Sequence, residues 1–198
     1  MVLVALSVLL WGFFHSLFAS FEAKELARRW LGAWIARYYR LAYNLFALLS
    51  FVPVLVILFL TPDRQLYEIP LPWSALMMVG QFVALVVLVV GFLQVDAREF
   101  LGLRQVAGSL SSRGGELLTS GLYHYVRHPL YSAGLVFIWL IPIMTTNVLA
   151  INLALSLYVV CGAWLEEGRL LREYGDAYAA YQRRTPMLVP FLRFRRNK

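Results

Sequence analysis

The stretch from Pro129 to Leu165 contains no Asp, Glu, Lys or Arg, and it constrains the fold more than any other part of the sequence. A helix needs about 20 apolar residues to cross the hydrocarbon core of a membrane. Pro142 and Asn147 interrupt the stretch near its middle. We therefore predict two short membrane helices that are joined by a tight turn at residues 145–147 and form a hairpin.

The predicted hairpin has charged residues at both of its ends. Arg127 and His128 precede it, and Glu166 and Glu167 follow it. Because a hairpin returns the chain to the side that it left, we expect the basic and the acidic pair to lie close together at one membrane face. Two opposite charged pairs beside an aromatic tail indicate a polar site.

The composition is that of an integral membrane protein surrounded by a lipid bilayer. Hydrophobic residues make up 61% of the 198 residues and charged residues only 15%, whereas about a quarter of the residues of soluble domains are charged. The net charge of +7 raises the question of nucleic-acid binding, but the basic residues are placed as membrane topology requires, so we expect no nucleic-acid partner. Glycine-rich phosphate loops, H-E-x-x-H and C-x-x-C are absent from the sequence, which argues against a soluble nucleotide-binding fold and against a metal site.

Three further apolar stretches predict three more membrane helices, over residues 2–20, 38–60 and 73–94, with a basic loop between the first two. Five spans place every Lys and Arg except Arg64 on one side of the membrane, and positive residues favour the cytoplasmic side. The fold class that we predict is an all-α integral membrane protein with five transmembrane helices. The fourth and fifth helices form the hairpin, and the C-terminus is cytoplasmic.

The residues after the hairpin show the spacing of a helix with one apolar stripe. The stripe consists of Leu170, Leu171, Tyr174, Tyr178 and Tyr181. Pro186 and Pro190 end the pattern. We predict a C-terminal amphipathic cytoplasmic helix, and we divide the chain into a three-helix membrane part (residues 1–95) and a second part (residues 96–198) that contains the polar site.

Each candidate residue has a structural and a chemical interpretation. Glu166 and Glu167 are either a solvated pair at the membrane edge or carboxylates for a ligand ammonium or sugar diol. Arg127 and His128 either anchor the hairpin at the interface or hold an anion at a helix N-terminus. His15 lies well inside the first helix, where a polar group usually hydrogen bonds within the bundle or serves a function. These residues indicate a site but do not distinguish an enzyme from a binding protein.

The C-terminal part of the chain resembles a group of membrane methyltransferases. Its motifs are G-L-Y-x-x-V-R-H-P-x-Y-x-x-G, an uncharged hairpin, E-E-x-x-L, Y-G-x-x-Y-x-x-Y and P-x-x-x-P. In combination they resemble the enzymes related to isoprenylcysteine carboxyl methyltransferase and phospholipid methyltransferase. The matching residues are Gly121, Tyr123, Val126, Arg127, His128, Pro129, Tyr131, Gly134, Glu166, Glu167, Leu170, Tyr174, Gly175, Tyr178, Tyr181, Pro186 and Pro190.

The resemblance implies that the second part of the chain binds S-adenosylmethionine at the cytoplasmic face and releases S-adenosylhomocysteine. The cofactor-binding residues that it implies are Gly121, Tyr123, Val126, Arg127, His128, Pro129, Tyr131, Glu166, Glu167, Leu170, Tyr178 and Tyr181. The candidate catalytic residues are Arg127, His128 and His15. A thiol acceptor must also lose its proton, and His15, His124 or a nearby Arg can assist there.

Four shorter pieces are similar to the bacterial branch of this group, which includes methanethiol S-methyltransferases and NnrU-like proteins. They are W-G-x-x-H-S from Trp11, R-Y-Y-R-L-x-Y-N from Arg37, D-x-x-E-F-L-G-L-R-Q from Asp96 and P-I-M-T from Pro142. This branch implies a bacterial inner membrane and methyl transfer to a small thiol or a lipophilic acceptor. The alternatives are an isoprenoid or prenylcysteine carboxylate, a lipid amine, and a non-catalytic membrane sensor or assembly protein.

Overall fold

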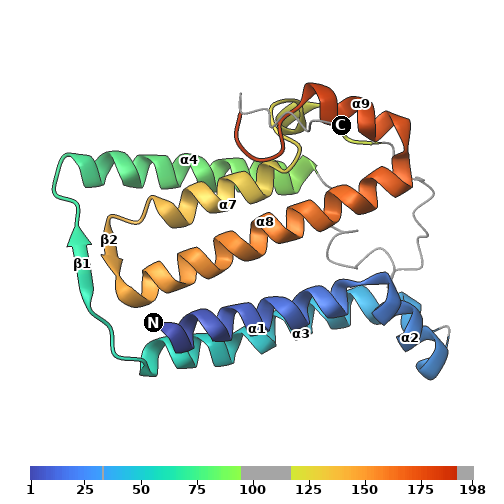
Figure 1. Ribbon diagram of the computed structural model, residues 1–198, viewed down its shortest axis with the longest axis horizontal. Helices are drawn as coiled ribbons and strands as arrows, with labels where there is room; N and C mark the ends of the chain where they lie inside the picture. Colours follow the sequence, from blue (N-terminus) through green and yellow to red (C-terminus); the bar gives the residue numbers. More distant parts are fainter. Residues whose placement is uncertain (33, 95–116, 191–198) are drawn as a thin grey trace. The chain divides into compact units, whose positions relative to one another are not determined.

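The computed structural model describes residues 1–32, 34–94 and 117–190, and these are mostly helical (Figure 1). The described residues form two compact units. The first unit comprises residues 1–67 and 144–158, and the second comprises residues 68–94, 117–143 and 159–190. The motif that starts at Asp96 lies outside the described residues.

The first unit contains α1 (Val2–Ala19), α2 (Phe21–Leu31) and α3 (Ile35–Leu60). The apolar helix α1 packs along α3, and Val8, Val54 and Ala154 form a small buried core. A side chain at Gly12 would meet the ring of Tyr158 at 2.7 Å. The absence of a Cβ at Gly12 therefore allows the Tyr158 ring to lie directly on α1.

The basic loop predicted after the first helix is instead the amphipathic helix α2. Ser20 ends α1 and accepts a hydrogen bond from the Ala23 amide at 3.1 Å, which caps the N-terminus of α2. Glu25 pairs with Arg28 and Arg29 on the exposed side of α2. The charge density of this segment was visible in the sequence, but its 11 residues were too few to show a helical period clearly.

In the second unit, α4 (Trp73–Gln94) packs against the shorter α7 (Pro129–Trp139). Gly80 and Gly91 lie three turns apart on α4. A Cβ at Gly80 would meet Leu140 at 2.6 Å, and a Cβ at Gly91 would meet Leu130 at 2.8 Å. These two glycines therefore let the two helices approach closely, as small residues do in membrane helix pairs.

Two short strands, β1 (Gln65–Glu68) and β2 (Ile143–Thr145), pair with each other, and neither was predicted. The remaining elements are the 3₁₀ helix η1 (Gly121–His124) and the helices α8 (Thr146–Tyr174) and α9 (Asp176–Arg184). In the predicted hairpin, residues 145–147 are therefore not a tight turn between two short helices. They are the end of β2 and the start of α8, a 29-residue helix that contains Glu166 and Glu167.

The expectation of an integral membrane protein with transmembrane helices is confirmed. Within the described ranges, four helices are long and apolar enough to cross a membrane: α1, α3 from Arg37, α4 and α8. The helix α7 is also apolar but has only 11 residues. The fifth crossing and the amphipathic role of the C-terminal helix stay predictions.

Candidate active site

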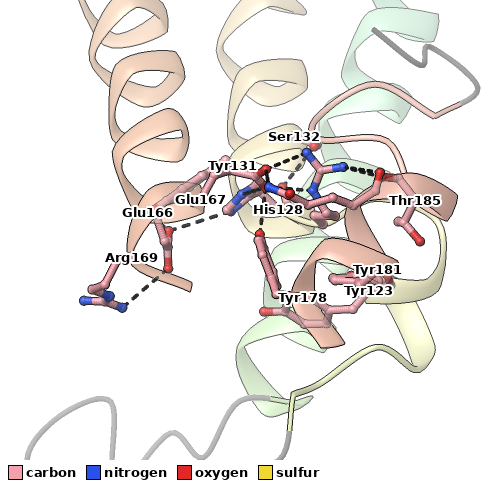
Figure 2. A network of polar contacts seen from close by, with 12 residues as sticks. Tyr123, His128, Tyr131, Ser132, Glu166, Glu167, Arg169, Tyr178, Tyr181 and Thr185 are labelled. Carbon is pink, nitrogen blue, oxygen red and sulfur yellow. Dashed lines mark hydrogen bonds and ion pairs between the residues drawn. The ribbon is translucent and has the colours of Figure 1, made fainter. Parts of the chain in front are cut away.

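The centre of the candidate site is a bidentate ion pair between Arg127 and Glu167 in the second unit. Figure 2 shows Glu167 with its neighbours His128 and Tyr178. Arg127 Nε donates to Glu167 Oε1 and Nη2 donates to Oε2, both at 2.7 Å. Each side chain is about 10% exposed. Parallel bonds between a guanidinium and a carboxylate fix both groups in distance and in orientation.

Glu167 also accepts hydrogen bonds from three other side chains. His128 Nε2 lies 3.0 Å and the Tyr178 hydroxyl 2.8 Å from Glu167 Oε1, and Gln182 Nε2 lies 2.6 Å from Oε2. A buried carboxylate needs such donors to offset its loss of hydration. Glu167 on α8 therefore connects the start of α7 with α9.

The Arg127 segment also holds the chain that follows α9. Arg127 Nη1 donates to the carbonyl oxygens of Gln182, at 3.2 Å, and Thr185. The Arg127 and His128 amides donate to the carbonyls of Pro186 and Met187 at 2.9 and 3.1 Å. The guanidinium is thus engaged on every side by this chain, and the cluster fastens the tail to the start of α7.

Glu166 has a more open environment than its neighbour. Its side chain is 32% exposed, and its Oε2 accepts a hydrogen bond from the Tyr131 hydroxyl at 3.0 Å. His128 Nδ1 lies 3.7 Å from the same oxygen, and Arg169 lies 3.9 Å from Oε1. The rings of His128 and Tyr131 are stacked, with centroids 5.4 Å apart. The carboxylate oxygens of Glu166 can therefore accept further hydrogen bonds from a ligand. The side chain itself is held in place by Tyr131, whose ring stacks on His128.

Three tyrosines of the cluster stay neutral donors at physiological pH. Burial, together with the hydrogen bond to the Glu167 carboxylate, raises the pKa of Tyr178 well above its usual range. Burial raises the pKa of Tyr181 to about 12, and its hydroxyl donates to the Tyr123 carbonyl. Burial and the nearby Glu166 carboxylate raise the pKa of Tyr123. The hydrogen bonds that the Tyr178 and Tyr181 hydroxyls donate therefore keep their directions near neutral pH.

A cleft of about 570 Å³ lies in the same unit, next to the fastened tail. Its walls include the tail residues Thr185 and Pro186, the cationic side chain of Arg184, and His124 and Tyr125 of the η1 segment. Small-molecule sites are typically clefts of roughly 300–1,000 Å³. The cleft is thus large enough for a ligand of cofactor size.

The structure brings most of the predicted site residues together. Val126 and Pro129 are buried on the Arg127 segment, with Pro129 in the first turn of α7. Gly121 has a φ of +62° and lies against the Gln94 side chain, where a Cβ would meet Gln94 at 2.5 Å. Leu170 lies half-buried on α8. The sequence did not predict that Gln182 and Thr185 belong to the site. Gln182 contributes an ordinary polar side chain and Thr185 a backbone carbonyl, and neither has a sequence signal that distinguishes it from other tail residues.

His15 lies in the first unit, within a cluster of aromatic side chains. Its ring stacks on Trp11 with centroids 4.9 Å apart, and its Nε2 lies 2.8 Å from the Tyr43 hydroxyl. Tyr158 approaches the His15 ring edge-on, and its hydroxyl accepts from Ser16. This cluster joins two sequence motifs, W-G-x-x-H-S and R-Y-Y-R-L-x-Y-N, through the contact between His15 and Tyr43.

Comparison with known proteins places the chain in a family. Residues 2–185 match the family described as "Protein of unknown function (DUF1295)". The chain belongs to the DUF1295 family. No solved structure matches this DUF1295 chain.

Curated relatives of this DUF1295 chain are named methanethiol S-methyltransferase. One from Crocosphaera subtropica is 33% identical over 130 residues, which are 61% of this chain and 51% of the relative. One from Bradyrhizobium diazoefficiens is 39% identical over 108 residues (52% and 41%), and one from a Pseudomonas species is 30% identical over 176 residues (84% and 65%).

This DUF1295 chain therefore spans about half the length of the curated relatives that it matches. The similarity to the bacterial branch of the membrane methyltransferases, expected from the motifs, is confirmed.

Proposed function

We propose that this DUF1295 protein is an enzyme that transfers a methyl group from S-adenosylmethionine to a small thiol at the cytoplasmic membrane face. The names of its relatives support the methyl transfer and the thiol. The structural observation that carries the proposal is Glu166, a half-open carboxylate that Tyr131 orients beside the saturated Arg127–Glu167 pair.

The residues of the second unit fit this methyl donor. S-adenosylmethionine has a carboxylate, an ammonium, a ribose diol and an adenine, and when bound it supplies a methyl group activated by a sulfonium. Glu166 offers carboxylate oxygens for the ammonium or the diol, and Tyr131 and Leu170 offer apolar surface for the adenine. In the cleft, Arg184 offers a cation and His124 a ring N–H for the carboxylate.

Arg127 and Glu167 act in this proposal by positioning other groups. Both are already saturated by partners within the chain. They fix His128 through its Nε2 and fasten the tail that forms one wall of the cleft. Because alignment of reacting groups supplies a large part of catalysis, loss of this pair would impair transfer without removing a ligand contact.

Apolar surroundings favour the proposed reaction, and the chain supplies them. A sulfonium cation and a thiolate anion neutralise each other as the methyl group moves, so a dry environment disfavours the separated ions more than the transition state. Val126, Pro129 and Ala133 are all buried where α7 begins. They exclude water from one side of the Arg127 segment.

The decisive experiment is calorimetric titration of S-adenosylhomocysteine into the purified protein in detergent. We expect binding to the wild type and at least tenfold weaker binding to Glu166→Gln, because the amide lacks the charge that an ammonium requires. The matched control is Glu173→Gln, an exposed acid on the same helix, which should bind as the wild type does.

Turnover is then measured with methanethiol and S-adenosylmethionine, by gas chromatography of dimethyl sulfide. Formation of dimethyl sulfide by the wild type would support the thiol acceptor. Binding of S-adenosylhomocysteine without turnover of thiols, carboxylates or amines would favour the non-catalytic sensor. Absence of binding by the folded wild type would refute the proposal.

A further inference from the structure

We propose that a short-chain alkyl thiol binds in a hollow between α1 and α3, and that His15 takes the thiol proton through the Tyr43 hydroxyl. The inference rests on the proposed function, because it assigns the acceptor site of that reaction. It adds a location, a size range and the Tyr43 hydroxyl as the link between the thiol and His15, the candidate base expected from the sequence.

The hollow is small and almost entirely apolar. Its volume is about 160 Å³, and it is lined by Phe18, Tyr39, Ala42, Tyr43 and Phe46. One water molecule takes up about 30 Å³ of liquid, so the hollow holds a molecule of a few heavy atoms. An alkyl thiol of one to three carbons has this size, whereas a whole isoprenoid chain or phospholipid is larger.

The rings of the hollow are held in place by contacts within the first unit. Phe18 and Phe46 meet edge to face with centroids 4.9 Å apart. Tyr39 donates to the Phe18 carbonyl at 2.7 Å, which ties α3 to the end of α1. The hollow is therefore preformed, as small-molecule sites usually are.

One polar pair borders the apolar hollow. The Tyr43 hydroxyl lies 2.8 Å from His15 Nε2 and donates to it when Nδ1 carries the imidazole proton. The phenol oxygen then has lone pairs left to accept a hydrogen bond from an S–H group in the hollow. A thiol is thus recognised by its apolar carbons and by its one weak donor.

His15 lies among aromatic side chains. Its ring stacks on Trp11, and Tyr158 lies edge-on with centroids 6.1 Å apart. An aromatic face stabilises a cation by about 0.5–2 kcal/mol, so Trp11 offsets part of the cost of a buried imidazolium. The titratable side chains that contact His15 are Tyr43 from α3 and Tyr158 from α8, and among the described residues no carboxylate contacts it.

The proton transfer balances without a further reactant. The S–H bond breaks, its proton moves to the Tyr43 oxygen as the Tyr43 proton moves to His15 Nε2, and the electron pair stays on sulfur. The thiolate would then take up the methyl group that S-adenosylmethionine supplies when it is bound, and the donor sulfur would leave as the thioether of S-adenosylhomocysteine. His15 afterwards returns its proton to water.

The proton path is tested by the pH profile of Tyr43→Phe. This variant keeps the ring and loses the hydroxyl. We expect its rate of methanethiol methylation to fall about a hundredfold at pH 7. The loss should shrink above pH 9, where solution supplies the thiolate because thiol pKa values lie near 8.5–10. S-adenosylhomocysteine affinity should stay unchanged. A constant ratio of wild-type to variant rate across this pH range would overturn the relay.

The hollow is tested by filling it with Ala42→Leu. We expect the KM for methanethiol to rise about tenfold or more, while S-adenosylhomocysteine binds as before. Phe46→Ala should instead improve the use of butanethiol relative to methanethiol. Leu45→Ala, an exposed neighbour on α3 that does not line the hollow, is the matched control and should change neither value.

A binding measurement separates this inference from the proposed function. Saturation-transfer NMR of dimethyl sulfide is recorded with cofactor-free wild type and Ala42→Leu in lipid nanodiscs, so that partitioning into lipid cancels in the difference. A smaller signal in Ala42→Leu supports the hollow as a binding site. Equal signals would overturn the assignment of the hollow as the thiol site. The proposed function is judged separately, by S-adenosylhomocysteine binding and thiol methylation of the wild type.

Discussion

At the scale of single residues, Glu166 and Glu167 differ although they are neighbours in the sequence. Glu167 is buried and accepts five hydrogen bonds from four side chains, whereas Glu166 is about one-third exposed. Removing one partner of a buried ion pair costs about 3–5 kcal/mol, because the other charge stays buried. We therefore expect Glu167→Gln to be far more destabilising than Glu166→Gln.

The two substitutions are compared by thermal unfolding in the same detergent, followed by tryptophan fluorescence. For a chain of this size, 1 kcal/mol corresponds to about 2–4 °C, so a loss of about 3–5 kcal/mol in Glu167→Gln should lower the Tm by roughly 6–20 °C. Glu166→Gln should change it by about 2 °C or less. Equal Tm values would contradict the assignment of Glu167 to a structural role.

The sequence predicted that these charged pairs would meet but could not assign their separate tasks. Two adjacent residues on a helix point about 100° apart, so one of the two must face the tail. Which one does so depends on where Tyr178 and Gln182 approach from α9. That approach is set by the turn at Gly175, a long-range feature that local periodicity does not contain.

At the scale of single elements, the start of α8 is capped by a residue from a distant loop. Asp63 Oδ1 accepts hydrogen bonds from the Thr146 hydroxyl at 2.9 Å and from the Asn147 amide at 3.0 Å. A carboxylate at a helix N-terminus satisfies free amides and interacts favourably with the helix dipole. We expect Asp63→Asn to lower stability by at most about 1 kcal/mol, since the site is exposed to solvent.

The contribution of Asp63 should depend on pH with a definite sign. Partial burial raises the pKa of Asp63, but the hydrogen bonds that it accepts outweigh this and bring the pKa below its usual value. Its stabilisation is therefore present above about pH 4, the usual carboxyl pKa, and is lost as pH falls through the lower folded value. Tm values between pH 3 and 7 should show a wild-type advantage that disappears at the acidic end. An advantage that is unchanged at pH 3 would contradict this assignment.

Gly175 gives a second prediction for an element, the direction of α9. Its φ of +54° and ψ of −128° lie in a region open to glycine and strained for other residues. Gly175→Ala should cost about 1–3 kcal/mol and loosen α9. Limited proteolysis should cut the variant faster within residues 176–190, and Ala179→Gly, in the same helix, serves as the control. Equal cleavage of Gly175→Ala and wild type would contradict the strained turn.

The long apolar helices were predictable element by element, and the short elements were not. Hydropathy alone locates α1, α3, α4 and α8, because each contains a window of apolar residues long enough for a membrane. The strands β1 and β2 have four and three residues and depend on each other across about 75 residues of chain. The apolar stripe predicts a single helix from Leu170 to Tyr181. In the structure the backbone turns at Gly175, so these residues belong to the end of α8 and to α9.

At the scale of the whole molecule, composition predicted the membrane and the charge pattern predicted its orientation. Neither could fix the number of crossings, because α7 is shorter than a membrane helix. Its 11 residues span about 16 Å, whereas the hydrocarbon core measures about 30 Å. The six residues that follow, a turn, a bend and the strand β2, add at most about 20 Å. The helix and these six residues together are therefore long enough for a fifth crossing.

Residues 142–146 would lie where that crossing reaches the far face of the membrane, and their backbone groups are paired, as polar groups close to a membrane interior require. β2 pairs with β1, the Ile69 amide donates to the Pro142 carbonyl, and the Thr146 amide donates to the Arg64 carbonyl, both at 2.9 Å. We therefore expect five crossings, with residues 62–72 outside the cytoplasm and the C-terminus inside it. Green fluorescent protein fused after Lys198 should fluoresce, and alkaline phosphatase inserted within residues 62–72 should be active. An active phosphatase at the C-terminus would instead indicate an even number of crossings, and it would place Glu166 on the side where S-adenosylmethionine is not available.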